Sequence, residues 1–169
     1  SWFEMQVWDR CGARFDPAIL AGRRCFGGLD LASTKDLSAF VLVFPPYDDD
    51  GNIVEELGPD GEWYFVAHVF APKAKVDTQE GSDAAPYKKW AELGWLTVTP
   101  GAVNDYSIIR DTIIGACKKF QVQDIAFDPW NATQIVNELL DVDIPMVQVQ
   151  QNMSGLSHGA KQLERLVYG

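Results

Sequence analysis

The first half of the chain alternates short apolar segments with turn residues, a pattern typical of β-strands. Apolar residues, many of them β-branched or aromatic, predominate over 24–32, 37–44 and 63–70. Pro45 and Pro46 end the second segment, because proline cannot donate a hydrogen bond within a sheet. No helical pattern separates these segments, so we expect them to form an antiparallel meander.

Helical and strand-like segments alternate in the second half. We expect helices over residues 84–93, 105–120, 129–140 and 157–167, and strands over residues 95–98, 122–127 and 144–149. In the longest helix, Ile109, Ile113 and Cys117 are four residues apart and therefore share one face. A meander followed by alternating helices and strands predicts an α/β domain: a mixed sheet with helices on both faces, as in ribonuclease-H-like folds.

Length and composition fit a single domain. Residues 1–23 carry aromatic side chains without a regular period, and we expect a lead-in there to a domain over 24–169. No apolar run is long enough to span a bilayer, and the first residues lack a signal-peptide pattern, so no membrane partner is expected. The three cysteines show no CxxC spacing, which argues against a disulfide framework or a zinc site and fits a reducing cytoplasm.

The formal net charge of −10 is unfavourable for binding DNA, because proteins bind DNA largely through Lys and Arg. Much of this charge lies in one segment, since residues 48–62 hold seven Asp and Glu and no Lys or Arg. A solvated acidic loop is the expected structure there. The charge lowers the expected affinity of this chain for DNA without excluding a nuclease.

Asp30 is the first candidate for a functional residue. It lies in an apolar strand, and its neighbours on the same face, Gly28 and Ala32, are small. A buried carboxylate costs free energy unless it is paired, hydrogen-bonded or bound to a metal ion. Small neighbours would leave room for such an ion. A turn in which Asp30 bonds Ser33 or Thr34 is an equally good interpretation.

Asp128 is the second candidate, because it directly follows the strand over 122–127. Its position before Pro129 favours an N-cap at the head of a helix, although its other oxygen could still face a metal ion.

If the two strands are neighbours, Asp30 and Asp128 converge at one edge of the sheet. Close carboxylates repel each other unless a cation or proton lies between them. Mg²⁺ and Mn²⁺ prefer such oxygen ligands, and two such ions can hydrolyse a phosphodiester.

Other candidates are weaker. Asp36 could bind a metal ion or orient a ligand, but a cap of the turn after Asp30 is the favoured interpretation. His68 lies in an apolar strand and is interpreted as a core histidine. The chain has no GxxxxGK[ST] motif, so an ATPase phosphate loop is excluded from it.

These residues belong to a series of motifs that resembles the large terminase subunit of tailed bacteriophages. The motifs follow the family's order from about Trp8 onward. They are Cys25-Phe26-Gly27-Gly28-Leu29-Asp30-Leu31-Ala32 with Asp36 behind it, Trp63-Tyr64-Phe65, Tyr87 with Trp90, Gly94 and Leu96, Thr99-Pro100-Gly101, and Ile125-Ala126-Phe127-Asp128-Pro129-Trp130-Asn131-Ala132.

The resemblance implies an enzyme, the DNA endonuclease that cuts concatemeric viral DNA during genome packaging. It implies that Asp30 is the metal ligand of the first strand and Asp128 the second acidic ligand, with two Mg²⁺ or Mn²⁺ ions in the complete site. The implied partners are double-stranded DNA, an upstream ATPase domain reached through residues 1–23, the small terminase subunit and the portal protein, all in the host cell cytoplasm.

One feature departs from the family. Relatives supply a third acidic metal ligand from a helix further toward the C-terminus, and the chain ends at Gly169 before such a motif. The resemblance therefore implies a domain truncated at its C-terminal end, with an incomplete site that is not expected to be a finished nuclease by itself.

Two other functions stay open. An ATP-binding half of an actin-like or sugar-kinase-like phosphotransferase has an Asp with Gly and Thr behind its first strand, which Gly28, Asp30 and Thr34 match in part. Ala32, however, stands where that loop needs a glycine. A non-catalytic docking domain with the same fold is favoured by the acidic segment and the absent third ligand.

Overall fold

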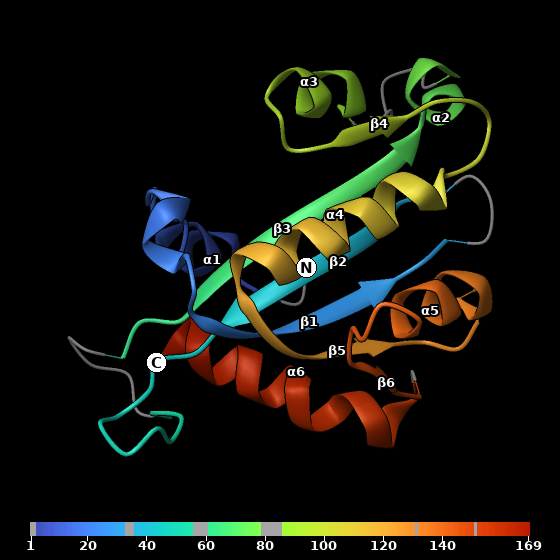
Figure 1. Ribbon diagram of the computed structural model, residues 1–169. Helices are drawn as coiled ribbons and strands as arrows, with labels where there is room; N and C mark the ends of the chain where they lie inside the picture. Colours follow the sequence, from blue (N-terminus) through green and yellow to red (C-terminus); the bar gives the residue numbers. More distant parts are fainter. Residues whose placement is uncertain (1–2, 33–35, 56–60, 79–85, 131, 151) are drawn as a thin grey trace.

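The computed structural model describes residues 3–32, 36–55, 61–78, 86–130, 132–150 and 152–169. Its centre is a mixed sheet of six strands in the order β4-β3-β2-β1-β5-β6. Helices lie on both faces of this sheet (Figure 1). The predicted α/β class, with a mixed sheet between helices, is confirmed.

The strands divide into a meander and a parallel set. They are β1 (Arg24–Asp30), β2 (Ser38–Phe44), β3 (Tyr64–Pro72), β4 (Thr97–Thr99), β5 (Gln121–Phe127) and β6 (Met146–Gln148). The first three pair antiparallel, as predicted, whereas β4, β5 and β6 each run parallel to a neighbour. Every strand except β2 therefore points the same way.

One consequence of this topology is a shared edge at which the parallel strands end and β2 begins. We call it the carboxyl edge, and it is defined by the strand ends Asp30, Pro72, Thr99, Phe127 and Gln148. In open α/β sheets, ligands commonly bind beyond the carboxyl ends of the strands. A ligand site is thus expected at the carboxyl edge.

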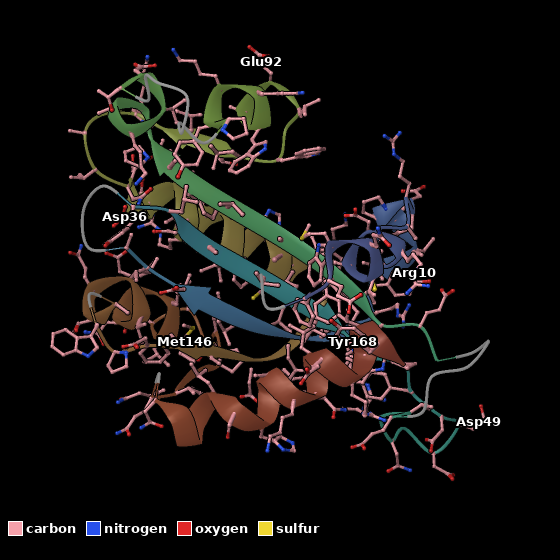
Figure 2. All side chains as sticks on the ribbon, turned by 180° about the vertical axis from the view of Figure 1, so that it is seen from behind. Arg10, Asp36, Asp49, Glu92, Met146 and Tyr168 are labelled. Atoms are coloured by element: carbon pink, nitrogen blue, oxygen red, sulfur yellow. The ribbon has the colours of Figure 1, made fainter. Side chains whose placement is uncertain are left out.

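The helices form two layers. They are α1 (Met5–Arg10), α2 (Lys73–Thr78), α3 (Tyr87–Glu92), α4 (Tyr106–Lys119), α5 (Thr133–Leu140) and α6 (Met153–Tyr168), with a short 3-10 helix over Pro17–Leu20. Figures 1 and 2 show α4 and α5 on one face of the sheet and α1 and α6 on the other. Among the described residues, no helix has both the length and the apolar character needed to cross a lipid bilayer.

The main core lies between the sheet and the α4–α5 layer. Alternate residues of β2, namely Phe40, Leu42 and Phe44, point into it and are completely buried, because successive side chains of a strand face opposite sides. Ile109 and Ile113 of α4 are equally buried against them, at the helical spacing predicted from the sequence. Burial of such side chains is the main source of stability in this layer.

The other face of the sheet is only partly covered. The strand pairing places Gly28, Asp30, Ala39, Val41 and Ala126 together on it. We call this the open face. None of these side chains is completely buried, so the face remains accessible next to the carboxyl edge.

Several helix boundaries differ from the prediction. The helix expected over 157–167 begins earlier, at Met153, because the side chain of Asn152 caps it by accepting a hydrogen bond from the Gly155 N–H at 2.8 Å. The helix α2 was not predicted. The helix expected over 84–93 begins at Tyr87, and residues 84 and 85 lie outside the described part of the chain.

The segment before β1 packs against the domain at two places. Leu20 is completely buried in the main core, and the ring of Phe15 lies edge-on to Tyr64 at 4.8 Å. Further toward the N-terminus, the Glu4 N–H donates a hydrogen bond to the Tyr168 hydroxyl at 3.1 Å. Residues 3–20 are therefore in contact with the core and with the end of α6.

The glycine pair of β1 gives a test of this packing. A Cβ on Gly27 would lie 2.9 Å from Ile125 Cγ1 and 3.1 Å from Phe40 Cε2, whereas a Cβ on Gly28 would meet nothing within 4 Å. We expect Gly27→Ala to lower the free energy of unfolding by about 1–3 kcal/mol through overpacking. Gly28→Ala should change it by less than about 0.5 kcal/mol. Urea denaturation of both variants measures the difference, and equal losses would contradict the described register.

Candidate metal centre at the carboxyl edge

The parallel pairing of β1 with β5 brings two carboxylates together. Leu29 pairs with Phe127, and each is followed directly by an aspartate, Asp30 or Asp128. Neighbouring strands are about 4.8 Å apart, so these aspartates lie side by side where their strands end. The convergence expected from the sequence is present in the fold.

A pocket of about 280 Å³ is lined by both aspartates. Its floor is the open face, with Gly28, Ala39 and Ala126, and Leu156 of α6 contributes to its wall. Since a Cβ on Gly28 would meet no atom within 4 Å, the small residue beside Asp30 does leave free space. The pocket can therefore receive an ion or a phosphate group between the carboxylates and α6.

Asp30 is exposed at the last position of β1. Among the described residues, its carboxylate makes no hydrogen bond or ion pair. The turn contact with Ser33 or Thr34 stays a prediction, because those two residues lie outside the described part of the chain. No described residue therefore competes with a cation for the oxygens of Asp30.

Asp128 has a different local structure from the one predicted. Its Oδ1 accepts a hydrogen bond from the Trp130 N–H at 2.8 Å, and α5 begins only at Thr133, with Ala132 at the N-cap position. The prediction that Asp128 caps a helix starting at Pro129 is therefore wrong. The carboxylate closes a short turn instead, which is the other common role of an aspartate before proline, and its second oxygen is left for a ligand.

Asp36 is engaged elsewhere. Its carboxylate forms an ion pair with Lys75 at 2.6 Å, with the Lys75 side chain only 20% exposed and that of Asp36 84% exposed. The hydrogen bond to Asp36 raises the pKa of Lys75 above its usual value. Figure 2 labels Asp36 in the connection between β1 and β2. Asp36 does not line the pocket with Asp30 and Asp128.

Other reactive side chains lie away from the pocket. His68 stacks on Phe40 with ring centroids 6.0 Å apart, and burial lowers its pKa, which suits a core histidine. Burial raises the pKa of Cys25 to about 12, so its thiol stays protonated at neutral pH and is a poor nucleophile. Neither residue lines the pocket.

The residues present fit a divalent metal ion in part. Asp30 and Asp128 supply the hard oxygen ligands that Mg²⁺ and Mn²⁺ prefer. Across the described part of the chain, no three His, Cys, Asp or Glu side chains are close enough to hold a metal ion together. Mg²⁺ usually keeps several waters, so two carboxylates can hold an ion whose other positions stay open.

Sequence reasoning missed the residues that complete the surroundings of this site. Leu156 reaches the pocket only because α6 crosses the open face, and no local pattern predicts that. Ser38, Asn104 and Tyr106 contact the main chain after Asp30 through their side chains. Only Asn104 and Tyr106 lie near a predicted feature of the sequence, because the helix expected over 105–120 begins between them.

Comparison with known proteins gives one family. The family described as "Terminase large subunit, endonuclease domain" matches residues 1–169. The chain is similar to "Terminase, large subunit" of Enterobacteria phage HK97, with 28% identity over 163 residues that cover 95% of this chain and 29% of the relative. It is also similar to "Protein YmfN" of Escherichia coli, with 28% identity over 173 residues that cover 99% of this chain and 36% of the relative.

The fold agrees with these sequence matches. The crystal structure of the HK97 bacteriophage large terminase superposes with a TM-score of 0.78 at 26% identity, covering 98% of this chain and 32% of that chain. The chain thus spans about a third of the length of the proteins it matches.

The turn at Asp128 can be tested apart from any activity. Asp128→Asn keeps a side-chain oxygen for the Trp130 N–H, so the free energy of unfolding should change by less than about 0.5 kcal/mol. Asp128→Ala removes this acceptor and should cost about 1 kcal/mol. Chemical denaturation of both variants distinguishes these outcomes, and a fully stable Asp128→Ala protein would show that the turn does not need the carboxylate.

Proposed function

The chain belongs to the family of terminase large-subunit endonuclease domains, and from this premise we propose that it hydrolyses phosphodiester bonds of double-stranded DNA during genome packaging. The observation that carries the proposal is the juxtaposition of Asp30 and Asp128 at the ends of paired parallel strands, in one pocket. In the proposed site both aspartates are metal ligands, for two Mg²⁺ or Mn²⁺ ions when the site is complete.

The two aspartates have different tasks in this proposal. Asp30, with both oxygens available, takes the larger part in binding the cations. Asp128 holds the Trp130 N–H with one oxygen at 2.8 Å, which fixes the direction in which its other oxygen faces the pocket. The chemistry supplied at a site with two such ions is activation of water and stabilisation of the leaving oxygen. One P–O bond forms to the water oxygen as another breaks.

The first part of the acidic segment, residues 48–55, lies at the other end of the sheet, so its charge does not oppose DNA binding at this site. β2 begins at the carboxyl edge and ends at Phe44, and the acidic residues follow from Asp48. Figure 2 shows Asp49 and Asp36 at opposite ends of the molecule. Two arginines hold the segment there: Arg24 donates to the Gly51 carbonyl at 3.3 Å and Arg165 to the Glu55 carbonyl at 2.7 Å.

The family match favours a nuclease over the phosphotransferase half that the sequence left open. A non-catalytic docking domain shares the fold and is separated from the nuclease by the experiments below. The further partners in the proposal are an ATPase domain of the same polypeptide, the small terminase subunit and the portal protein, in the cytoplasm of the host.

Loss of either carboxylate should abolish cleavage. In the full-length protein with Mn²⁺ or Mg²⁺, we expect Asp30→Asn and Asp128→Asn each to reduce the rate of cleavage of linear duplex DNA by about 100-fold or more. The matched control is Asp49→Asn, which makes the same charge change at the opposite end of the sheet and should leave the rate unchanged. Undiminished cleavage by Asp30→Asn would refute the nuclease site and favour the docking domain.

Metal binding can be observed directly on this chain. Crystals soaked in Mn²⁺ should show anomalous density between Asp30 and Asp128, because close carboxylates attract a cation between them. The same soak of an Asp30→Asn crystal should lose that density. Density at Asp36 with none at Asp30 would contradict the assignment of the ligands.

A further inference from the structure

Buried polar side chains are concentrated at one place in this fold. Among the described residues, they are Ser38, Thr99 and Asn104, with exposed fractions of 0%, 0% and 7%. All three lie at the carboxyl edge, where Ser38 begins β2, Thr99 ends β4, and Asn104 precedes α4. Because a buried polar group is unfavourable without a hydrogen-bond partner, this concentration calls for a specific set of partners.

The partners are main-chain groups of the connection that follows Asp30. The Ala32 N–H donates to Ser38 Oγ at 3.0 Å, and the Tyr106 hydroxyl donates to the Ala32 carbonyl at 2.8 Å. Ala32 is thus held through both of its main-chain polar groups, by side chains from β2 and from the first residue of α4. It lies only two residues beyond Asp30.

The other end of the same connection is held as well. Asn104 Nδ2 donates to the Asp36 carbonyl at 2.8 Å and lies 3.2 Å from Ser38 Oγ. The Asp36 carboxylate pairs with Lys75 of α2. Side chains from β2, α2 and the start of α4 therefore meet at Ala32 and Asp36, and we call Ser38, Asn104 and Tyr106 the edge cluster.

The edge cluster is itself anchored to the sheet. Thr99 Oγ1 donates to the Ala71 carbonyl at 3.4 Å and accepts from the Asp105 N–H at 3.3 Å. The Asp105 side chain then caps α4 by accepting from the Ser107 N–H at 2.9 Å. Hydrogen bonds thus run from the end of β3 through β4 to α4, which gives the cluster a rigid base.

One atom of the edge cluster is energetically unfavourable. Asn104 Oδ1 is buried without a hydrogen-bond partner among the described residues. An unpaired buried acceptor lowers stability, so this arrangement is not the most stable way to hold a turn. An unsatisfied buried group of this kind calls for a specific explanation.

The geometry of Asp30 explains why this connection must be held. Its carboxylate has no hydrogen-bonding or ion-pair partner in the described part of the chain, where only the main chain around Asp30 sets its direction. The ladder with β2 ends at the pair Asp30–Ala39, and the next fixed point beyond it is Ala32. The atoms that bind a metal ion need their positions fixed to within about 0.5 Å.

We propose that Ser38, Asn104 and Tyr106 are positioning residues of the metal centre, which hold the main chain at Ala32 and Asp36 and thereby aim the Asp30 carboxylate into the pocket. The inference rests on the proposed function, because it assigns a task to Asp30. By this proposal, side chains of β2 and of the start of α4 act in metal binding, although the two aspartates lie at the ends of β1 and β5. These side chains are anchored in turn to the ends of β3 and β4.

The test removes single hydroxyls. Tyr106→Phe deletes only the group that holds the Ala32 carbonyl, and Ser38→Ala deletes the acceptor of the Ala32 N–H. The matched control is Tyr64→Phe at the start of β3, since Tyr64 is also half-buried and its hydroxyl bonds Glu62, away from the carboxyl edge. Each variant is made in the full-length protein, with Asp30→Asn alongside.

Three quantities separate positioning from support of the fold: the Mn²⁺ concentration for half-maximal cleavage, the KM for duplex DNA, and the melting temperature without metal. We expect Tyr106→Phe and Ser38→Ala to raise the Mn²⁺ requirement about 10-fold, as loss of groups that orient metal ligands does, with KM unchanged. Tyr64→Phe should leave the Mn²⁺ requirement at the wild-type value. Calorimetric titration of Mn²⁺ into the variants provides the same comparison without DNA.

Two results would overturn the inference while leaving the proposed function intact. One is an inactive Asp30→Asn protein together with an unchanged Mn²⁺ requirement in both Tyr106→Phe and Ser38→Ala. The other is a lower melting temperature in these two variants with no change in Mn²⁺ affinity, which would show a purely structural cluster. Wild-type cleavage by Asp30→Asn would instead remove the proposed function, and the inference with it.

Discussion

The parallel pairing of β1 with β5 is the constraint on which the site depends. These strands are about 100 residues apart in sequence and are brought together by burial of α4 and α5 on one face of the sheet. The close approach of Gly27 to Ile125 leaves no room for a side chain there. Because the pairing ends at Leu29 and Phe127, an aspartate follows each of these residues, and in the proposed site the repulsion between the two carboxylates favours a cation between them.

Much of this arrangement could be predicted from local patterns. The meander, the helix carrying Ile109 and Ile113, and the convergence of the two aspartates follow from periodicity and element order. The role of Asp128 could not be predicted, because an aspartate before proline suits both a helix cap and a short turn, and the packing of α5 decides between them. The contact of Tyr106 with Ala32 joins residues 74 positions apart, and no local signal reports such a pair.

The two ends of the sheet have opposite characters. At the carboxyl edge, buried hydroxyl and amide groups hydrogen-bond to main-chain atoms, while the Asp30 carboxylate has no partner among the described residues. At the other end, Arg24 and Arg165 donate to main-chain carbonyls of the acidic segment. Among the described residues of this segment, Asp48, Asp49, Asp50 and Glu55 form no ion pair. The buried polar contacts and the described acidic side chains thus lie at opposite ends of the strands.

The position of α6 has a mechanical consequence. This helix has 16 residues, which corresponds to a rod about 24 Å long. Near its beginning Leu156 lines the pocket, and at its end Tyr168 contacts Glu4 and the ring of Phe3. A rotation of about 10° around the end near Tyr168 would displace the other end by about 4 Å over that length. The single helix α6 thus connects the first residues of the chain, which it contacts at Tyr168, to the wall of the pocket at Leu156, so a small tilt of this rod is all that would separate a narrower pocket from a wider one.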